Sequence, residues 1–418
     1  MRGAARETGL GAAVMARLEA LAGFTEVPGE LTRLYLSPAH KAAALQVKHW
    51  MVQAGMEATI DAVGNVVGRY EGTAPDMPAL LLGSHIDTVR NAGRYDGTLG
   101  VVAAIQAVAE LNSSGERRPF AIEVLAFGDE EGVRFPVTLT GSRAVAGRLD
   151  PAALDAEDAN RVSVREALQQ FDCNPFEIPD VPRRREDVLG YIELHIEQGP
   201  VLEAEGLPVG VVTAINGASR FLVDLTGEAG HAGTVPMALR RDALAAAAEM
   251  ILAIERRGAA TPELVATVGL IEALPGAVNV IPGAARCTID IRAPADGVRA
   301  EATLDLEREL AAIAERRGVG MAMRRTYDAP AAACAPWLVE ELEGAVTRTG
   351  IRPRRLPSGA GHDALAVVDL CPIGMLFVRC KGGISHNPAE QVSADDAGAA
   401  VGVLLDLLRH FEPASAVA

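Results

Sequence analysis

Imidazole and carboxylate side chains recur in five short segments of the chain, and most of these segments follow a run of apolar residues. The segments are 83–88 (GSHIDT), 95–97 (YDG), 128–132 (GDEEG), 193–197 (ELHIE) and 385–388 (SHNP). Such side chains suit Zn, Mn, Ni or Co, and two nearby divalent ions that share a carboxylate need about five of them. The candidate ligands are His85, Asp96, Glu131, His195 and His386. With Glu130 left as a base, this set predicts a two-metal hydrolase.

The first two segments have a local chemical logic. Asp87 follows His85 by two residues, so its carboxylate can accept the second imidazole N–H and fix the ring for metal binding. His-x-Asp by itself is more often a polar loop. Asp96 lies between Gly93 and Gly97, which let the backbone turn tightly and bring the carboxylate near two ions.

The pair Glu130-Glu131 ends an apolar run, and adjacent carboxylates repel each other unless a cation is close. Two neighbouring glutamates are usually a solvated turn, but the segment 132–136 (GVRFP) makes a fully exposed turn the weaker interpretation. We assign Glu131 to the metal and Glu130 to proton transfer, and the reverse assignment stays open. Polar and apolar residues alternate strictly in 191–197, which predicts His195 on the polar face of a strand.

Composition limits the class of protein. The chain has 418 residues, 22% of them charged, and a net charge of −16, which argues against a nucleic acid or an anionic membrane as partner. Its five cysteines form no CxxC pair, as expected for reduced thiols. Charged residues interrupt segment 1–21, unlike a signal peptide, and no apolar run approaches the ~20 residues of a membrane span. We therefore expect a cytoplasmic protein.

The order of the predicted elements indicates two domains, since the chain exceeds the roughly 250–300 residues that one core supports. Helical and strand patterns alternate in the first half. The helices are expected at 41–54 and 101–111, and the strands at 65–69, 79–82 and 121–127. This alternation predicts an α/β sheet covered by helices. Metal-type residues follow two of the predicted strands, where open α/β sheets place their sites.

The pattern changes near residue 216. A strand, a helix, two strands, a helix and a strand are expected at 221–226, 236–257, 264–271, 285–292, 298–317 and 321–325. This is the element order of a ferredoxin-like unit. The first pattern resumes after Pro330. We therefore expect a discontinuous α/β catalytic domain, residues 1–215 and 328–418, with an inserted α+β domain at 216–327.

Six motifs in this order resemble the M20 peptidase-type amidohydrolase superfamily, and specifically its hydantoinase/carbamoylase branch. The motifs are GSHIDTV, YDGTLGV, DEEGVRFP, ELHIEQGP, GHAGT and GGISHNPAE. The branch contains N-carbamoyl-L-amino-acid hydrolases, allantoate amidohydrolases and microbial β-ureidopropionases. The resemblance implies a phosphorylase/hydrolase-like catalytic domain, and an insert that closes over the site and forms a homodimer interface.

The resemblance also implies roles for individual residues. Two divalent ions per subunit, Zn, Mn, Ni or Co, would share one carboxylate, with the ligand sets His85, Asp96, His195 and Asp96, Glu131, His386. Asp87 would orient His85, and Glu130 would be the general base. The residues around the substrate would be Gln198, Arg220, His231, Asn279, Arg292, Gly359, Ala360 and His362. His231 would also stabilise the oxyanion, either within its own chain or across the dimer interface.

Without the resemblance, Arg220 and Arg292 would pass for surface arginines, and His231 could equally stabilise a turn. With it, the expected reaction is hydrolysis of the C–N bond of a small ureido acid, an N-carbamoyl-L-amino acid or allantoate, with release of ammonia and carbon dioxide. Arg292, helped by Asn279, would hold the substrate carboxylate. Two other interpretations remain: an M20-type dipeptidase or aminoacylase with the same metal site, and a non-catalytic metal- or ligand-binding protein.

Overall fold

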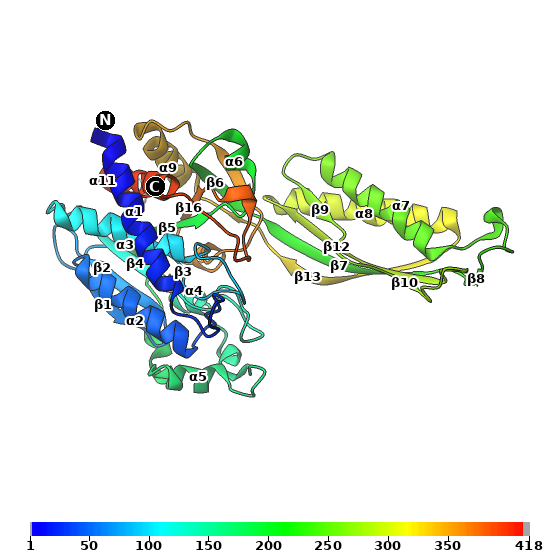
Figure 1. Cartoon of the computed structure of the whole chain (residues 1–418), viewed down its shortest axis with the longest axis horizontal. Coiled ribbons are helices and arrows are strands. Elements are labelled where there is room, and N and C mark those ends of the chain that lie inside the picture. The colour runs from blue at the N-terminus through cyan, green and yellow to red at the C-terminus, as the bar shows by residue number, and fades with distance from the viewer. Residues whose placement is uncertain (1, 413–418) are drawn as a thin grey trace. The chain divides into compact units, whose positions relative to one another are not determined.

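The computed structural model describes residues 2–412, and contacts within the chain divide it into two compact units (Figure 1). The first unit contains the chain up to Thr213, the segment Cys334–Leu356 and the chain from Ala360 onward. The second contains Ala214–Ala333 and Pro357–Gly359, so the predicted insert at 216–327 falls inside it. Among the described helices, none is long and apolar enough to cross a membrane.

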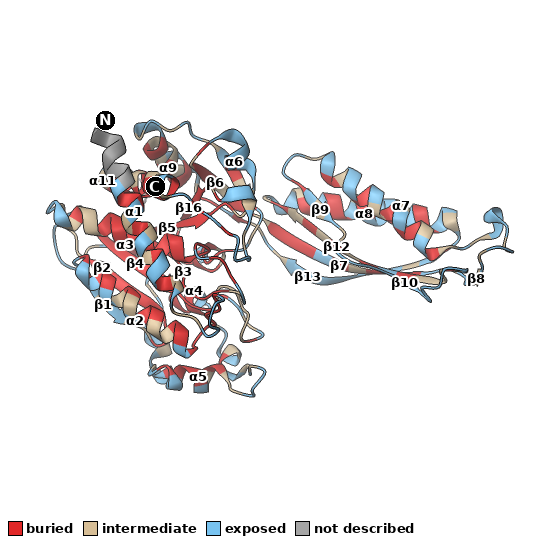
Figure 2. Cartoon of the chain, in the orientation of Figure 1, coloured by how far each residue is buried: buried red, intermediate tan, exposed pale blue. Residues whose placement is uncertain are grey.

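The first unit is built on a nine-stranded mixed sheet. Eight strands follow one another across it in the order β1 (Glu57–Ile60), β2 (Val66–Tyr70), β4 (Ala121–Phe127), β3 (Ala79–His85), β5 (Val188–Ile196), β16 (Ile373–Val378), β6 (Val209–Ile215) and β14 (Ala332–Ala333), and β15 (Arg355–Ser358) pairs with β6. The four strands β4, β3, β5 and β16 run parallel to their neighbours in this group. Every residue of these four strands is buried (Figure 2), as parallel strands covered on both faces usually are.

Nine α-helices accompany this sheet within the described chain. They are α1 (Arg2–Ala22), α2 (Pro38–Gln53), α3 (Thr98–Ser113), α4 (Thr140–Val145), α5 (Val164–Gln170), α6 (Val201–Glu205), α9 (Pro336–Arg348), α10 (Ala364–Val367) and α11 (Ala394–His410). The apolar α3 packs on β3 and β5, while α1 and α11 pack against α3. The helix α2 contacts β1 and β2 and begins where the Ser37 side chain accepts a hydrogen bond from the backbone N–H of His40.

The second unit has a five-stranded antiparallel sheet with two long helices. The sheet order is β10 (Ile271–Leu274), β12 (Ala284–Ala293), β7 (Gly217–Thr226), β13 (Gly320–Ala329), and β9 (Val265–Thr267) also pairs with β12. The helices α7 (Ala243–Ala259) and α8 (Asp296–Arg317) pack on this sheet around a core that includes Val223, Met250 and Leu306. A small ribbon of β8 (Gly230–His231) and β11 (Val280–Ile281) lies beyond the Thr226 end of β7.

Two predicted elements of this unit have different bounds, for local reasons. The helix expected at 236–257 begins at Ala243, because the Asp242 side chain accepts a hydrogen bond from the backbone N–H of Ala245 and so caps it. The preceding residues form a single 3₁₀ turn, Met237–Leu239. The strand expected at 264–271 is divided into β9 and β10, which both pair with β12.

Candidate active site

The histidine and carboxylate segments meet at one edge of the main sheet because the parallel strands end there. β3 ends at His85, which pairs in register with Phe127, the last residue of β4. His195 is the penultimate residue of β5, the neighbour of β3 on its other side. In open α/β sheets the carboxyl ends of parallel strands are where ligands bind. This edge therefore positions three of the predicted ligand segments.

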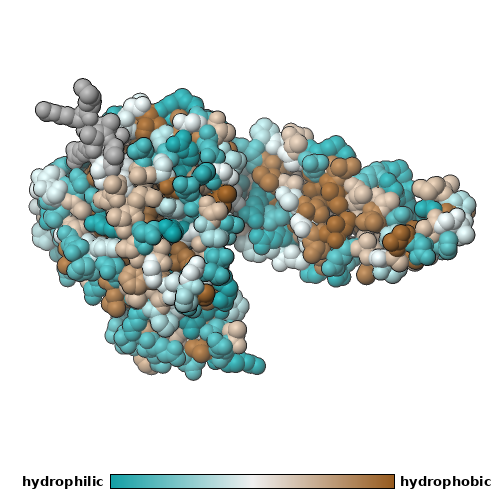
Figure 3. Space-filling view, in the orientation of Figure 1, coloured by the Kyte–Doolittle hydropathy of each residue, from teal (hydrophilic) through white to brown (hydrophobic). Residues whose placement is uncertain are grey.

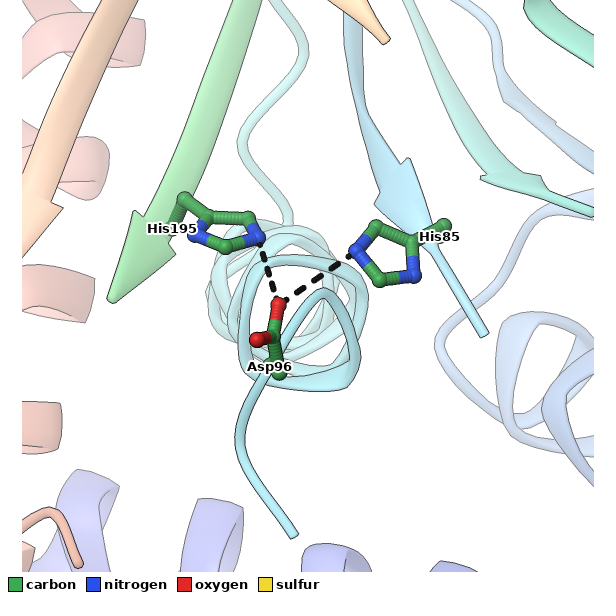
Figure 4. Close-up of side chains that lie close together, drawn as sticks. All are labelled: His85, Asp96 and His195. Carbon is green, nitrogen blue, oxygen red and sulfur yellow. Dashed lines mark ion pairs between the residues drawn. The ribbon is translucent and has the colours of Figure 1, made fainter. Parts of the chain in front are cut away.

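Asp96 reaches the same place from the turn that precedes α3. Its Oδ1 lies 3.0 Å from Nε2 of His195 and 3.5 Å from Nε2 of His85, between the two rings (Figure 4). Gly97 makes this possible, because its φ is +64° and a Cβ atom there would lie 2.4 Å from the His85 ring. Any other residue at this position would displace the imidazole or the carboxylate.

A second group of side chains surrounds the other oxygen of Asp96. Nε2 of His386 lies 3.4 Å from Asp96 Oδ2 and 3.5 Å from Glu131 Oε2. The ligand atoms of each of three sets lie within 4.8 Å of one another: His85, Asp96, His195; Asp96, Glu131, His386; and His85, Glu130, Glu131. Asp96 thus belongs to two sets, one on each carboxylate oxygen. Because Glu130 and Glu131 share the third set, their two roles remain interchangeable.

The donor set fits divalent cations. It combines imidazole nitrogens with carboxylate oxygens, the ligands that Zn, Mn, Ni and Co accept. The Oε1 atom of Glu131 is buried and has no hydrogen-bond partner within the described chain. An unsatisfied buried carboxylate oxygen is costly, and a cation beside it would remove that cost. Two observations therefore support these residues as metal ligands: their donor atoms are of the right chemical type, and one buried carboxylate oxygen lacks a hydrogen-bond partner.

Burial and mutual repulsion shift the protonation of this site in the absence of a cation. Burial, with Asp96 and Asp87 nearby, raises the pKa of Glu131 to about 8. Burial also raises the pKa of Glu130 well above its ordinary value, and Glu131 adds to that shift. Burial acts to lower the pKa of His85, but the hydrogen bond to Asp96 and the nearby charges of Glu130, Asp87 and Glu131 together outweigh it and raise the pKa well above its ordinary value. A divalent ion would reverse the shifts of the two glutamates, because it is the largest charge in such a site.

The two buried histidines have their second ring nitrogens fixed by carbonyl groups. Nδ1 of His195 lies 2.9 Å from the carbonyl oxygen of Ile196, and Nδ1 of His85 lies 3.1 Å from that of Asp87. This contact leaves the Nε2 lone pair of each ring available to bind a cation beside Asp96. The carboxylate of Asp87, predicted to accept from His85, is 3.7 Å from Nδ1 and instead accepts from the backbone N–H groups of Glu130 and Glu131.

Two of the predicted substrate residues lie beside this cluster. The side chain of Gln198 donates from Nε2 to Asp96 Oδ2 over 2.8 Å, so it contacts the shared carboxylate. The ring of His362 is buried, and its centroid lies 4.4 Å from that of His195 in an edge-to-face arrangement. Burial lowers the pKa of His362 well below its ordinary value. Ala360 immediately precedes this region and is partly buried.

Arg220 and Arg292 meet in the second unit through one carboxylate. Asp290 accepts from Nε of Arg220 over 2.9 Å, and from Nε and Nη2 of Arg292 over 2.8 and 3.0 Å. Nη1 of Arg292 donates to the carbonyl oxygen of Gly359 over 2.7 Å. These residues line a cavity of about 610 Å³ together with Phe221. Two guanidinium groups and one carboxylate give this cavity a net positive charge.

His231 and Asn279 lie at the β8/β11 ribbon, beyond the opposite end of this sheet. Both are exposed, and the backbone N–H of Ala232 donates to the carbonyl oxygen of Asn279 across the β8/β11 ribbon. The strand β12 runs from Ala284, near this ribbon, to Arg292 and Ala293 at the other end. Eight residues at about 3.4 Å each separate the two ends by ~27 Å. One copy of the second unit thus holds its predicted substrate residues in two distant groups.

Comparison with known proteins identifies the family. The sequence profile of peptidase family M20/M25/M40 matches residues 81–410 of this chain. The chain belongs to this family. It is 41% identical to the N-carbamoyl-L-amino acid amidohydrolase of Geobacillus stearothermophilus, over 90% of this chain and 92% of that protein. It is 40% identical to allantoate deiminase 1 of Glycine max, over 95% of this chain and 89% of that protein.

A solved structure agrees with this assignment. The crystal structure of an amidase of the hydantoinase/carbamoylase family from Burkholderia multivorans matches with a TM-score of 0.90 and 34% identity, over 95% of this chain and 97% of that one. The predicted family is confirmed, and so is the prediction of a hydrolase that acts on amide C–N bonds. M20 enzymes depend on metal ions, and this M20 chain has the clusters to bind them.

Sequence reasoning missed part of the surroundings of this M20 site. Ser385 donates to Asp96 Oδ2, and Glu390 accepts from the backbone N–H of Asp96 over 3.1 Å. Glu193, two residues before His195 on β5, accepts from Ser84 and from the backbone N–H of Ala364. Glu193 and Glu390 belong to the quoted motifs, but the contacts join segments far apart in the chain. No local spacing rule gives such contacts.

Proposed function

We propose that the protein hydrolyses the carbamoyl C–N bond of a ureido acid, an N-carbamoyl-L-amino acid or allantoate, and releases ammonia and carbon dioxide. The observation that carries this proposal is the sharing of Asp96 between two three-donor sets beside Glu130. The names of the two relatives, an N-carbamoyl-L-amino acid amidohydrolase and an allantoate deiminase, favour the ureido class of substrate.

The metal content that we propose is two divalent ions per chain, Zn, Mn, Ni or Co. One set of ligands is His85, Asp96 and His195, and the other is Asp96, Glu131 and His386. Ions bound there supply Lewis acidity, which activates a water molecule and polarises a carbonyl oxygen. Because Asp96 presents one oxygen to each set, it is the bridging carboxylate in this proposal.

Glu130 is the proton carrier in the proposed reaction. Its side chain is 12% exposed, and its Oε2 lies 3.9 Å from Nε2 of His85. A carboxylate at this position takes a proton from the attacking water and returns it to the nitrogen that leaves. His231 would donate a hydrogen bond to the oxyanion that forms at the carbamoyl carbon, a kind of contact worth ~3–4 kcal/mol.

The cavity of the second unit would hold the carboxylate of the substrate. Arg292 has five N–H groups, and three of them donate to Asp290 and Gly359. One N–H remains on each terminal nitrogen, which suits a carboxylate bound by two parallel hydrogen bonds. Arg220 would add positive charge, because Asp290 neutralises one of the two guanidinium groups and leaves the other uncompensated.

The distance between the two groups of substrate residues supports a homodimer in which sites are shared. The ribbon that carries His231 and the end of β12 that carries Arg292 are ~27 Å or more apart, too far for one small ureido acid to contact both. We propose that the second unit forms the dimer interface and that His231 completes the partner subunit's site. Figure 3 shows a hydrophobic area over α7 and α8, where Leu252 and Leu304 are 54% and 59% exposed.

The cellular location that we propose is the cytoplasm. The five cysteines are free thiols, and four of them are buried. Free thiols without disulfides are usual in reducing compartments.

Replacement of Glu130 tests the proposed chemistry. Glu130→Gln keeps the size of the side chain but cannot accept the proton, so we expect ammonia release to fall by about 10²–10⁴-fold while two metal ions remain bound. Ammonia is measured after incubation of Mn-, Zn-, Ni- or Co-loaded protein with allantoate, N-carbamoyl-L-methionine or N-carbamoyl-β-alanine. Full activity of the variant would contradict the role of Glu130. Glu131→Gln, measured in parallel, distinguishes the two glutamates, because it should lose metal.

The substrate panel separates the proposal from its competitor. Wild-type turnover of one ureido acid, with none of dipeptides or N-acetyl amino acids, would support it. Two bound metals with turnover of dipeptides or N-acetyl amino acids alone would instead indicate a dipeptidase or an aminoacylase.

A further inference from the structure

The loop that carries His386 is bound to the turn that carries Asp96 by one buried side chain. Glu390 lies four residues after His386 and is 5% exposed. Its Oε1 accepts from the backbone N–H of Tyr95 over 2.7 Å and from that of Asp96 over 3.1 Å. These contacts join parts of the chain that are more than 290 residues apart in sequence. A carboxylate that accepts from two consecutive N–H groups holds the backbone of that turn in one orientation.

The second oxygen of Glu390 reaches the shared carboxylate through a hydroxyl group. Ser385 lies 3.3 Å from Glu390 Oε2 and donates to Oδ2 of Asp96. Gln198 donates to the same oxygen of Asp96 and to Ser385 Oγ. Glu390 therefore holds the backbone of Asp96 directly, and Ser385, which lies beside the second oxygen of Glu390, holds its side chain.

The close approach of Glu390 requires the glycine at position 93. A Cβ atom there would lie 2.3 Å from Cδ and 2.4 Å from Oε1 of Glu390. The φ of Gly93 is not positive, so its conformation does not itself require glycine. The absence of a side chain at this position thus serves the contact with Glu390. This steric requirement supports the close contact with Glu390 separately from the hydrogen bonds.

We propose that Glu390 is a positioning residue that aligns Asp96 between the two ligand sets and couples it to the His386 loop. This inference rests on the proposed function, since it concerns the same metal site. Glu390 itself belongs to none of the three candidate ligand sets. It acts through Asp96 and Ser385. The Asp96, Glu131, His386 set depends on it most, because the two segments that Glu390 joins carry Asp96 and His386.

Metal binding, rather than turnover, is the measurement that tests this role. Mn²⁺ is titrated calorimetrically into metal-free wild-type protein and into Glu390→Ala, with thermal unfolding followed in parallel. We expect two binding steps for the wild type. For Glu390→Ala we expect one step to lose about 10–100-fold in affinity, the usual cost of losing an outer partner of a ligand, while the other step changes less.

Two further variants keep the test decisive. Glu390→Gln retains an oxygen that accepts from Tyr95 and Asp96, so it should bind Mn²⁺ nearly as tightly as the wild type. Gly93→Ala keeps the Glu390 side chain but pushes it away from its hydrogen-bond partners. This variant should therefore weaken the same Mn²⁺ binding step as Glu390→Ala. If Glu390→Ala does not fold, the contrast between Glu390→Gln and Gly93→Ala carries the test by itself.

Glu123→Ala is the matched control. Glu123 lies on β4, is as buried as Glu390 and forms an ion pair with Arg183. Its loss should lower the unfolding temperature without changing either Mn²⁺ step. Equal Mn²⁺ isotherms for Glu390→Ala and the wild type would overturn the proposal, and so would equal weakening in Glu123→Ala. Wild-type protein that binds two ions but hydrolyses no ureido acid would instead contradict the proposed function and leave these isotherms interpretable.

Discussion

The candidate metal cluster of the first unit and the predicted substrate residues of the second differ in how far the chain has already fixed them. His85, Asp96 and His195 are each at most 5% exposed and contact one another. His231 and Asn279 are exposed at the tip of a two-stranded ribbon, and Arg220 is half exposed. The cluster is organised within a single chain, whereas the predicted substrate residues of the second unit lie in two distant groups of one chain. Folding alone therefore forms the cluster, and under the proposal above the second region is complete only in a dimer with bound substrate.

The largest expected effect is at the buried cluster. His195→Ala removes a proposed ligand, so ammonia release should fall by more than the roughly 100-fold that loss of an outer partner of a ligand costs. The number of bound Mn²⁺ ions should fall from two to one, as measured by elemental analysis. His49→Ala, at an exposed position of α2, serves as the control and should leave both quantities unchanged. A His195 variant with two ions and full activity would remove this residue from the site.

A heterodimer provides the sharpest test of the second region. His231→Ala should lower kcat by about 10²–10³-fold, as loss of an oxyanion donor does. If His231 acts across the interface, a heterodimer of His231→Ala and Glu130→Gln subunits has one intact site and should recover about half of the wild-type activity per dimer. Two affinity tags isolate this species after co-expression. An inactive heterodimer would show that His231 serves its own chain.

The arginine cavity should give a smaller effect. Arg292→Lys keeps the charge but cannot hold a carboxylate by two parallel hydrogen bonds, so kcat/KM should fall roughly 10- to 100-fold, mostly through KM. Steady-state kinetics measure the effect with an N-carbamoyl amino acid and with the analogue in which its carboxylate is replaced by a carboxamide. The variant and the wild type should differ little on the amide. The same loss on both substrates would show that Arg292 does not bind the carboxylate.

The smallest expected effect concerns a buried histidine of the first unit that lies outside the cluster. Burial lowers the pKa of His40 to about 3, and its Nε2 has no partner among the described residues. Below about pH 6.5 the unfolded chain binds a proton at this residue that the folded chain does not. His40 should therefore contribute a loss of about 2 kcal/mol to the free energy of unfolding between pH 8 and pH 5.

His40→Asn isolates that contribution. Its side-chain oxygen can still accept from the backbone N–H of Leu36, as Nδ1 of His40 does over 3.1 Å, but it does not titrate. Urea unfolding at pH 8 and pH 5 should show a loss about 2 kcal/mol smaller than in the wild type. Equal losses in the two proteins would mean that folded His40 is protonated.

The strand that carries His195 illustrates how far sequence patterns lead. The alternation in 191–197 predicts a strand, and β5 covers Val188–Ile196. The same alternation is usually a sign of one solvated face, yet all nine residues of β5 are buried. The polar face is turned toward other polar side chains, as when Glu193 accepts from Ser84. An alternating pattern therefore indicates that the two faces of a strand have different surroundings. It does not indicate whether the polar face contacts water or other polar side chains.

The candidate cluster was predictable as a set of residue types, but not its internal contacts. The sequence marks Asp96 by its flanking glycines, and the structure adds what each glycine accommodates: the His85 ring at Gly97 and Glu390 at Gly93. Glu390 and Tyr95 are 295 residues apart. Spacing rules act over a few residues, so such a contact follows only from the path of the whole chain.

The path of the chain into and out of the second unit has a consequence for chain entropy. The backbone N–H of Cys334 donates to the carbonyl oxygen of Thr213 over 2.9 Å, where β14 pairs with β6. An excursion of more than a hundred residues therefore departs and returns at adjacent points. Closing so long a loop costs little more than closing a short one, and the excursion has a core of its own. A short turn from Thr213 to Cys334 should accordingly leave the first unit as an almost continuous chain, with the candidate metal ligands intact and the arginine cavity absent.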